Sequence, residues 1–176
     1  MVHNMGVRGD GMENRIVLYA SAYGSTQRYA EYIAHALGCA AVDIRRVKPQ
    51  MLEAADTVVF GGWLCGGAVA GSGALASRRE MLRGKRLFVF ITGAGEHGGT
   101  ARMNDIVASN FTAPAPEKVF YLRGNICYRK MHWYHKFLIN YLMFDDNNRG
   151  RKWLKQENQF LREKEADSLI LYIKSL

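Results

Sequence analysis

The chain has 176 residues, of which 48% are hydrophobic and 23% charged, and its formal net charge is +8. This length suits one domain with its own buried core, and no apolar run approaches the roughly 18 residues that a membrane-spanning helix requires. The charge predicts attraction to something anionic, namely nucleic acid, a membrane surface, or an acidic partner or substrate. Three cysteines without CxxC spacing, Cys39, Cys65 and Cys127, fit reduced, buried thiols in a cytoplasmic protein better than a disulfide framework.

The beginning of the chain indicates a loose segment followed by a strand and a helix. Residues 1–12 hold Gly and polar residues but no apolar core of a secretory signal, so we expect a flexible tail ahead of one domain over residues 13–176. The apolar run Arg15–Ala20, rich in β-forming residues, predicts a buried strand. From Thr26 onward, apolar residues recur every three or four positions, which predicts an amphipathic helix that ends at Gly38.

The same alternation of strands and helices continues along the chain. Further strands are expected at Ala41–Ile44, Thr57–Phe60, Arg86–Thr92 and Lys118–Leu122. Further helices are expected at Ala74–Leu82, Ala101–Ser109, Lys130–Phe144 and about Gln156–Ser175. Short apolar strands separated by helices are typical of an α/β fold with a doubly wound, five-stranded parallel sheet and helices on both faces.

The loop after the first strand is a candidate binding site, because ligands of open parallel sheets bind beyond the carboxyl ends of the strands. Its residues are Ser21, Ala22, Tyr23, Gly24, Ser25 and Thr26. Hydroxyl groups and successive backbone amides run here into a helix N-terminus, where unpaired amides and the helix dipole favour an anion such as phosphate. Since the loop has no Lys or Arg, neutral donors would hold the phosphate. The alternative is that Ser25 or Thr26 only caps the helix.

This loop resembles the Ser/Thr-x-x-Gly-x-Ser/Thr segment with which flavodoxins hold the phosphate of FMN. The matching positions are Ser21, Gly24, Ser25 and Thr26. The resemblance implies a flavodoxin-like sheet with strand order 2-1-3-4-5 and FMN as a non-covalent redox cofactor. It also implies that the loops after the third and fourth strands contact the flavin.

After the third strand, the segment Gly61–Gly67 predicts a flexible loop that carries one large aromatic residue. The candidate flavin contacts in it are Gly62, Trp63, Leu64 and Cys65. The resemblance implies that this loop packs against the isoalloxazine ring, where stacking of Trp63 would add roughly 1 kcal/mol beyond the area it buries. The alternative is that Trp63 folds over the edge of the sheet.

The loop after the fourth strand is rich in glycine, which lets a backbone approach a ligand closely. It resembles the third flavin-contacting loop, and its candidate residues are Thr92, Gly93, Ala94 and Gly95. The same loop contains G-x-G-x-x-G, ending at Gly98, so a dinucleotide site is an alternative. Glu117 disfavours that alternative, because this acid precedes its strand, whereas ribose recognition needs an acid at the far end of the strand.

The C-terminal third is basic and aromatic, with nine Lys or Arg against two Asp between Lys118 and Lys155. The helix expected within 128–150 carries apolar residues on two stripes, which fits burial in the interior, a homodimer, or peripheral contact with an anionic membrane. His132 and His135 are expected to be solvated or hydrogen-bonded rather than to bind a metal. Nucleic acid is not expected as a partner, because no binding module for it is recognised.

Residues Tyr128 to Met143 resemble the signature of the menaquinone-dependent protoporphyrinogen oxidase family. The matching positions are Tyr128, Trp133, Tyr134, Phe137, Ile139 and Met143. The resemblance implies an FMN enzyme that oxidises a porphyrinogen and passes the electrons to a membrane quinone, with no residue assigned as a catalytic acid, base or nucleophile. Two alternatives stay open, namely a flavodoxin-type carrier between protein partners and a flavin-free interaction module.

Overall fold

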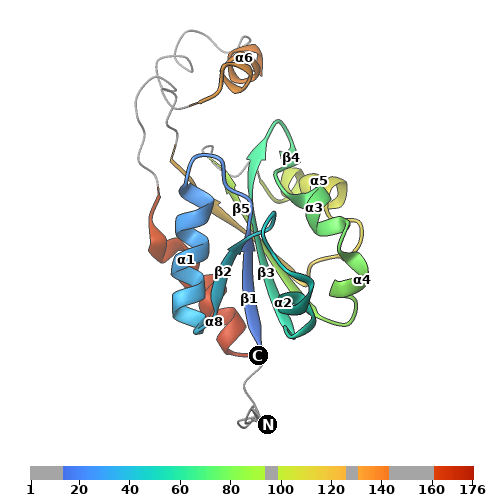
Figure 1. The fold of residues 1–176 in the computed structure, drawn as a ribbon. Coiled ribbons are helices and arrows are strands. Elements are labelled where there is room, and N and C mark those ends of the chain that lie inside the picture. Colours follow the sequence, from blue (N-terminus) through green and yellow to red (C-terminus); the bar gives the residue numbers. More distant parts are fainter. Residues whose placement is uncertain (1–13, 94–98, 126–130, 143–160) are drawn as a thin grey trace, which may run out of the picture.

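A parallel β-sheet runs through the centre of the molecule and has helices on both faces (Figure 1). The computed structural model describes residues 14–93, 99–125, 131–142 and 161–176. The flexible tail expected at residues 1–12 and the thiol of Cys127 lie outside these ranges.

Five strands form the parallel part of the sheet. They are β1 (Arg15–Tyr19), β2 (Ala40–Asp43), β3 (Thr57–Cys65), β5 (Arg86–Gly93) and β6 (Lys118–Arg123). Their order is β2-β1-β3-β5-β6, and each neighbouring pair is parallel. This order confirms the predicted flavodoxin-like arrangement. The first strand lies inside the sheet, the second is added on one side of it, and the later strands are added on the other side. A short sixth strand, β4 (Ala68–Val69), pairs antiparallel with the end of β3 and was not predicted.

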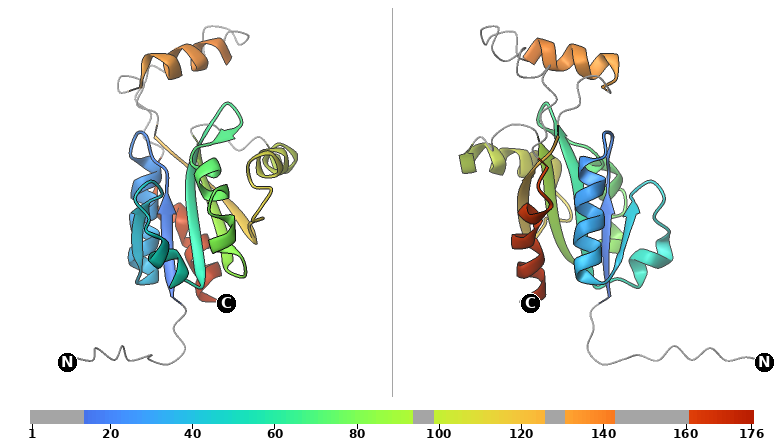
Figure 2. Two further views of the ribbon diagram at one scale, coloured as in Figure 1. Left: turned by 45° about the vertical axis from the view of Figure 1, so that its right-hand side comes forward. Right: turned by 90° about the vertical axis from the view of Figure 1, so that its left-hand side faces the viewer.

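The helices divide between the two faces of the sheet (Figure 2). One face is covered by α1 (Ser25–Leu37) and α8 (Asp167–Lys174), the latter preceded by a 3-10 turn, η2 (Glu163–Ala166). The other face is covered by α2 (Pro49–Glu53), α3 (Ser72–Ala76), α4 (Arg79–Leu82) and α5 (Gly99–Asn110). A further helix, α6 (Trp133–Leu142), lies beyond the carboxyl ends of the strands. Among the residues described, no helix is long and apolar enough to cross a membrane.

Several predicted boundaries need correction. The helix predicted at Ala74–Leu82 is two short helices, because the chain leaves helical geometry between α3 and α4. The single turn α2 was missed, since five residues are too few to show a helical period. In the described part of the predicted helix Gln156–Ser175, residues 161 and 162 are not helical, Glu163–Ala166 form the turn η2, and the α-helix begins only at Asp167.

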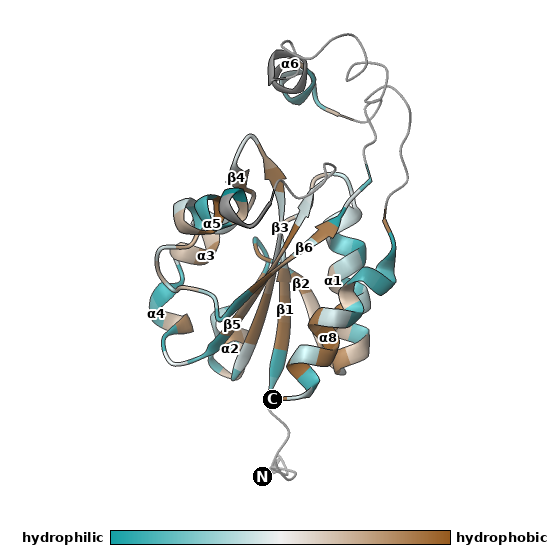
Figure 3. Cartoon of the chain, turned by 180° about the vertical axis from the view of Figure 1, so that it is seen from behind, coloured by the Kyte–Doolittle hydropathy of each residue, from teal (hydrophilic) through white to brown (hydrophobic). Residues whose placement is uncertain are grey.

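Two apolar cores flank the sheet, because successive residues of a strand point to opposite faces. Leu18 and Phe60 belong to the core beneath α2–α5, together with Leu75 of α3. Val17 belongs to the opposite core, together with Ile33 of α1. With both faces buried, the middle parts of β1, β3 and β5 are apolar, as Figure 3 shows, while the charged residues Arg15 and Arg86 stand at the starts of β1 and β5.

A polar clamp holds the C-terminal segment against the end of β6. The buried Tyr29 of α1 donates its hydroxyl proton to the carbonyl oxygen of Arg123 at 2.8 Å. The backbone N–H of Arg123 in turn donates to Glu165 of η2 at 2.9 Å, and the N–H of Leu161 donates to the side-chain oxygen of Asn125 at 2.7 Å. These bonds fix the position at which the chain leaves β6, next to the N-terminus of α1.

Candidate functional site

The loop between β1 and α1 presents an open helix N-terminus. Gly24 is the N-cap residue and adopts a left-handed conformation (φ 93°) that favours glycine. Its N–H donates to Ser21 Oγ at 3.1 Å, and the first intrahelical bond runs from the N–H of Arg28 to the carbonyl of Gly24 at 3.0 Å. Within the described residues no side chain caps this helix, so neither Ser25 nor Thr26 fills the role of a simple cap.

The amides at this N-terminus precede the first intrahelical bond, so the helix itself leaves the N–H groups of Ser25, Thr26 and Gln27 without an acceptor. Among the described residues, no atom lies within 4 Å of the place where a Cβ atom on Gly24 would stand, so the space beside this residue is open. Open space beside neutral donors at the positive end of a 13-residue helix suits an anion the size of a phosphate group.

The hydroxyl groups beneath the loop connect three strand ends. Thr26 Oγ1 lies 2.7 Å from Thr92 Oγ1 of β5, and both side chains are buried. Ser25 Oγ accepts the N–H of Asn125, two residues beyond β6, at 3.0 Å. The loop is therefore held by the ends of β5 and β6, and Asn125 is a site residue that sequence analysis missed.

The segment after Phe60 is not the flexible loop that the glycines predicted. Residues 61–65 continue β3, and Trp63 pairs in register with Thr92. Positions 61 and 62 have room only for glycine, because a Cβ atom on Gly61 would collide with the Phe90 ring and one on Gly62 would collide with the Val69 side chain. These glycines therefore serve packing, and the candidate residues Gly62, Trp63, Leu64 and Cys65 lie on a strand rather than in a loop.

A tight turn and one asparagine fix the end of this strand. Gly66 and Gly67 have φ values of 58° and 91°, which reverse the chain into β4. The Asn110 side chain accepts the N–H of Val69 at 2.8 Å and donates to the carbonyls of Gly67 and Ile106, both at 2.8 Å. Sequence analysis missed Asn110, whose partners Gly67 and Val69 are 43 and 41 positions away in the chain.

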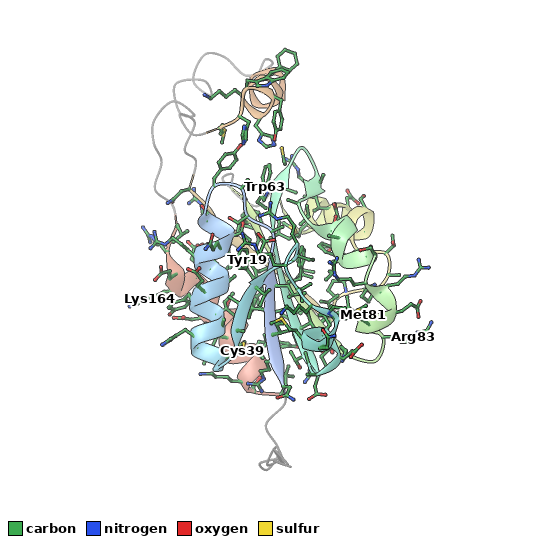
Figure 4. The ribbon with its side chains drawn as sticks, viewed as in Figure 1. Tyr19, Cys39, Trp63, Met81, Arg83 and Lys164 are labelled. Atoms are coloured by element: carbon green, nitrogen blue, oxygen red, sulfur yellow. The ribbon has the colours of Figure 1, made fainter. Side chains whose placement is uncertain are left out.

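Three aromatic rings meet above the carboxyl edge of the sheet. The rings of Trp63 and Tyr23 are 5.9 Å apart in an edge-to-face arrangement, and the ring of His135 on α6 is 4.9 Å from Trp63 at an interplanar angle of 90°. Tyr23 Oη lies 2.6 Å from His135 Nδ1 and also accepts the backbone N–H of His132 at 3.4 Å. Figure 4 shows Trp63 at the end of β3 that faces α6. His135 is hydrogen-bonded, as expected, but its contact with the candidate site was not predicted.

Gly93, at the end of β5, also lies where a larger residue would not fit. A Cβ atom on Gly93 would collide with the hydroxyl group of Tyr121, and the carbonyl of Gly93 accepts the N–H of Gly124 at 2.8 Å. The candidates Ala94 and Gly95, and the last glycine of the G-x-G-x-x-G pattern, lie outside the described residues. Glu117, the acid that a dinucleotide site would need, instead pairs with Arg86 at 3.0 Å.

The candidate site is electrically neutral, since no residue of Ser21–Thr26, Gly62–Cys65 or Thr92–Gly93 carries a charged side chain. Burial raises the pKa of the Cys65 thiol and of the Tyr23 hydroxyl, so both stay protonated at neutral pH. Burial, and secondarily the nearby His132, lower the pKa of His135, so its imidazole is neutral and able to accept a hydrogen bond. The arrangement can hold an anion through neutral donors and a flat aromatic group against Tyr23 and Trp63.

Comparison with known proteins bears on this arrangement. Residues 16–164 match a family described as a flavodoxin domain. Similar solved structures include oxidised Flavodoxin 1 from Bacillus cereus, with 15% identity over 73% of this chain and 96% of that chain and a TM-score of 0.45. A putative flavoprotein from Bacteroides eggerthii has 16% identity over 75% of this chain and 97% of that chain, with a TM-score of 0.49. Two-electron reduced flavodoxin from Megasphaera elsdenii has 16% identity over 61% and 84%, with a TM-score of 0.47. A comparison with curated protein sequences gave no match.

Proposed function

The chain belongs to the flavodoxin domain family, and on this premise we propose that it binds FMN at the carboxyl edge of its sheet and acts as a redox protein. The observation that carries the proposal is the convergence of three features at one edge. These are the uncapped N-terminus of α1, the half-buried ring of Trp63, and the buried contact between Thr26 and Thr92 that ties the loops together.

The phosphate of FMN would be held by the open amides of Ser25 and Thr26, with the Ser21 hydroxyl next to them. Gly24 supports this assignment, because no atom of the described residues lies within 4 Å of the place where its Cβ would stand. The bound cofactor would supply electron transfer, while the protein orients the ring and limits its contact with water. Trp63 and Tyr23 would provide the aromatic walls, and the neutral thiol of Cys65 would add no charge beside the ring.

The test is FMN binding by the full chain, with riboflavin as the phosphate-free comparison. The purified protein is expected to retain flavin absorption bands after incubation with FMN and desalting. Ala22→Asp, an exposed change in the loop, should weaken FMN binding at least tenfold through charge repulsion but leave riboflavin binding nearly unchanged. Ala54→Asp, an equally exposed change at the end of α2, is the matched control and should leave both affinities unchanged. Failure of the wild-type protein to take up FMN would favour the flavin-free interaction module.

We further propose that the substrate is a porphyrinogen and the electron acceptor a quinone, each turnover moving two electrons and two protons from one to the other. The support is the resemblance of Tyr128 to Met143 to the menaquinone-dependent protoporphyrinogen oxidases. Anaerobic mixing of the FMN-loaded protein with protoporphyrinogen should bleach the flavin, and a soluble quinone should restore its colour. Bleaching and reoxidation only by redox proteins would assign the chain to the flavodoxin-type carriers instead.

A quinone acceptor requires contact with a membrane, and α6 is the surface we propose for it. Trp133 and Phe137 are 79% and 70% exposed, and the stretch Lys118–Lys155 carries a formal charge of +7. Aromatic side chains beside basic residues suit the interface of an anionic bilayer. The protein should float with phosphatidylglycerol vesicles but not with phosphatidylcholine vesicles, and Trp133→Ser with Phe137→Ser should abolish flotation. Leu171→Ser, which removes an exposed apolar side chain from α8, is the control. If the protein forms a stable dimer and does not float with vesicles, this surface would be assigned to contact with a second copy of the chain.

A further inference from the structure

His135 contacts both aromatic residues of the candidate site, although it comes 112 positions after Tyr23 and 72 positions after Trp63 in the chain. We propose that His135 is a positioning residue that fixes the orientation of Tyr23 and Trp63 and thereby ties α6 to the cofactor site. This inference rests on the proposed flavin site, because it assigns those two rings to the walls of that site.

The hydrogen bond to Tyr23 defines one half of the arrangement. The Tyr23 hydroxyl accepts the backbone N–H of His132 and lies 2.6 Å from His135 Nδ1, so the tyrosine proton is free to be donated to that nitrogen. His135 then carries its own proton on Nε2 and is neutral. The lowered pKa of His135, caused by burial, agrees with an imidazole that acts as an acceptor. The tyrosine ring is thereby held from both ends, by its backbone in the β1–α1 loop and by its hydroxyl on α6.

Ring packing defines the other half. The perpendicular contact of His135 with Trp63 at 4.9 Å and that of Tyr23 with Trp63 at 5.9 Å brace the indole against two neighbours. Edge-to-face contacts are directional, because the positive edge of one ring meets the negative face of the other. Since Trp63 sits on a strand whose backbone is fixed by pairing with β5, its side chain is the part that such contacts orient.

His135 also connects the exposed aromatic surface of α6 with the proposed flavin site. Trp133 and Phe137, the exposed aromatic residues of α6, lie two positions on either side of His135 in the chain. Anything that binds to them acts on the helix that holds Tyr23 and Trp63. Loss of His135 should therefore change the surroundings of the flavin ring without removing the phosphate contacts, which come from α1.

The experiment compares His135→Phe with His135→Asn in the FMN-loaded full chain. Phe keeps a ring against Trp63 but cannot accept the Tyr23 proton, whereas the side-chain oxygen of Asn can stand where Nδ1 stands. For His135→Phe we expect FMN affinity to fall by no more than about fivefold, the effect of one hydrogen bond. We also expect a changed visible circular dichroism of the flavin and a more positive midpoint potential, because water then reaches the reduced, charged ring. His135→Asn should restore the wild-type potential, and His35→Phe and His35→Asn, on the exposed side of α1, should change nothing.

Hydrogen exchange of the flavin-free protein separates this inference from the proposed function. Amides of α6 should exchange at least fivefold faster in His135→Phe and in Tyr23→Phe than in the wild-type protein, and the double variant should exchange no faster than either single one. Wild-type exchange in both single variants, or an unchanged flavin potential in His135→Phe, would overturn the inference. If the wild-type protein binds no FMN but the variants show the expected faster exchange, the proposed flavin site would be overturned. The inferred contact between α6 and the ends of the strands would then still stand.

Discussion

The hydroxyl group of Thr26, in the first turn of α1, lies 2.7 Å from the hydroxyl group of Thr92 on β5, and both side chains are almost fully buried. This bond crosses the edge of the sheet from the loop after β1 to the end of β5. It therefore sets the distance between two of the segments that form the candidate site.

Replacing either threonine by valine keeps the shape of the side chain but leaves the remaining hydroxyl unpaired. We expect Thr26→Val and Thr92→Val each to lower the free energy of unfolding by about 1–2 kcal/mol, and the double variant to lower it by less than the sum. Urea unfolding measures these values, with the exposed Thr112→Val as a control that should stay within about 0.5 kcal/mol of the wild type. Strictly additive losses would mean that the two hydroxyls do not bond to each other.

Asn110 should be the most sensitive polar side chain of α5. Asn110→Ala removes bonds to Gly67, Val69 and Ile106, and we expect a loss of about 2–3 kcal/mol in the free energy of unfolding. FMN binding should weaken as well, because the released hairpin carries Trp63. Asn104→Ala, an exposed change on the same helix, is the control. Equal stability of the two variants would show that the hairpin does not depend on Asn110.

The glycine at position 61 should not tolerate a methyl group. In Gly61→Ala the new Cβ would enter the space of the Phe90 ring, and we expect a loss of about 3 kcal/mol. Gly73→Ala is the matched control, because no atom in the described part of the chain lies within 4 Å of a Cβ there. Alanine is also the better helix former, so we expect a gain of up to about 1 kcal/mol. Thermal and urea unfolding of both variants decide the point, and a stable Gly61→Ala protein would contradict the close contact with Phe90.

The contact between α6 and Tyr23 should weaken in acid. Because the pKa of His135 is lowered in the folded protein, the unfolded chain binds a proton more readily as pH falls below the ordinary histidine value of about 6.5. The contribution of this contact to stability is therefore fully present above that pH and is lost progressively as pH falls from it through the lower pKa of the folded protein. Histidine NMR titration should give a pKa for His135 below the ordinary histidine value, and His132→Asn should raise it. A pKa for His135 at or above 6.5 would contradict the neutral acceptor.

The strand order and most elements could be predicted from the sequence, because strands buried on both faces read as unbroken apolar runs. The glycines after Phe60 misled the prediction, since a glycine that makes room for Phe90 cannot be distinguished in sequence from one that loosens a loop. Asn110 and His135 could not be predicted, because their partners Val69 and Tyr23 are 41 and 112 positions away. The candidate anion-binding loop could be recognised in the sequence because its glycine and hydroxyl residues are contiguous in the chain.

The hairpin at the end of β3 has a consequence for the behaviour of the protein at high concentration. The parallel registers of β3 stop at Gly61 on the β1 side and at Trp63 on the β5 side, so its last residues project beyond both neighbours. Ala68 and Val69 fold back and pair with Cys65 and Leu64. A projecting strand end with unpaired backbone groups is a template for strand addition from another molecule. Because β4 occupies one edge of this projecting strand end, we expect it to hinder strand addition at Leu64 and Cys65.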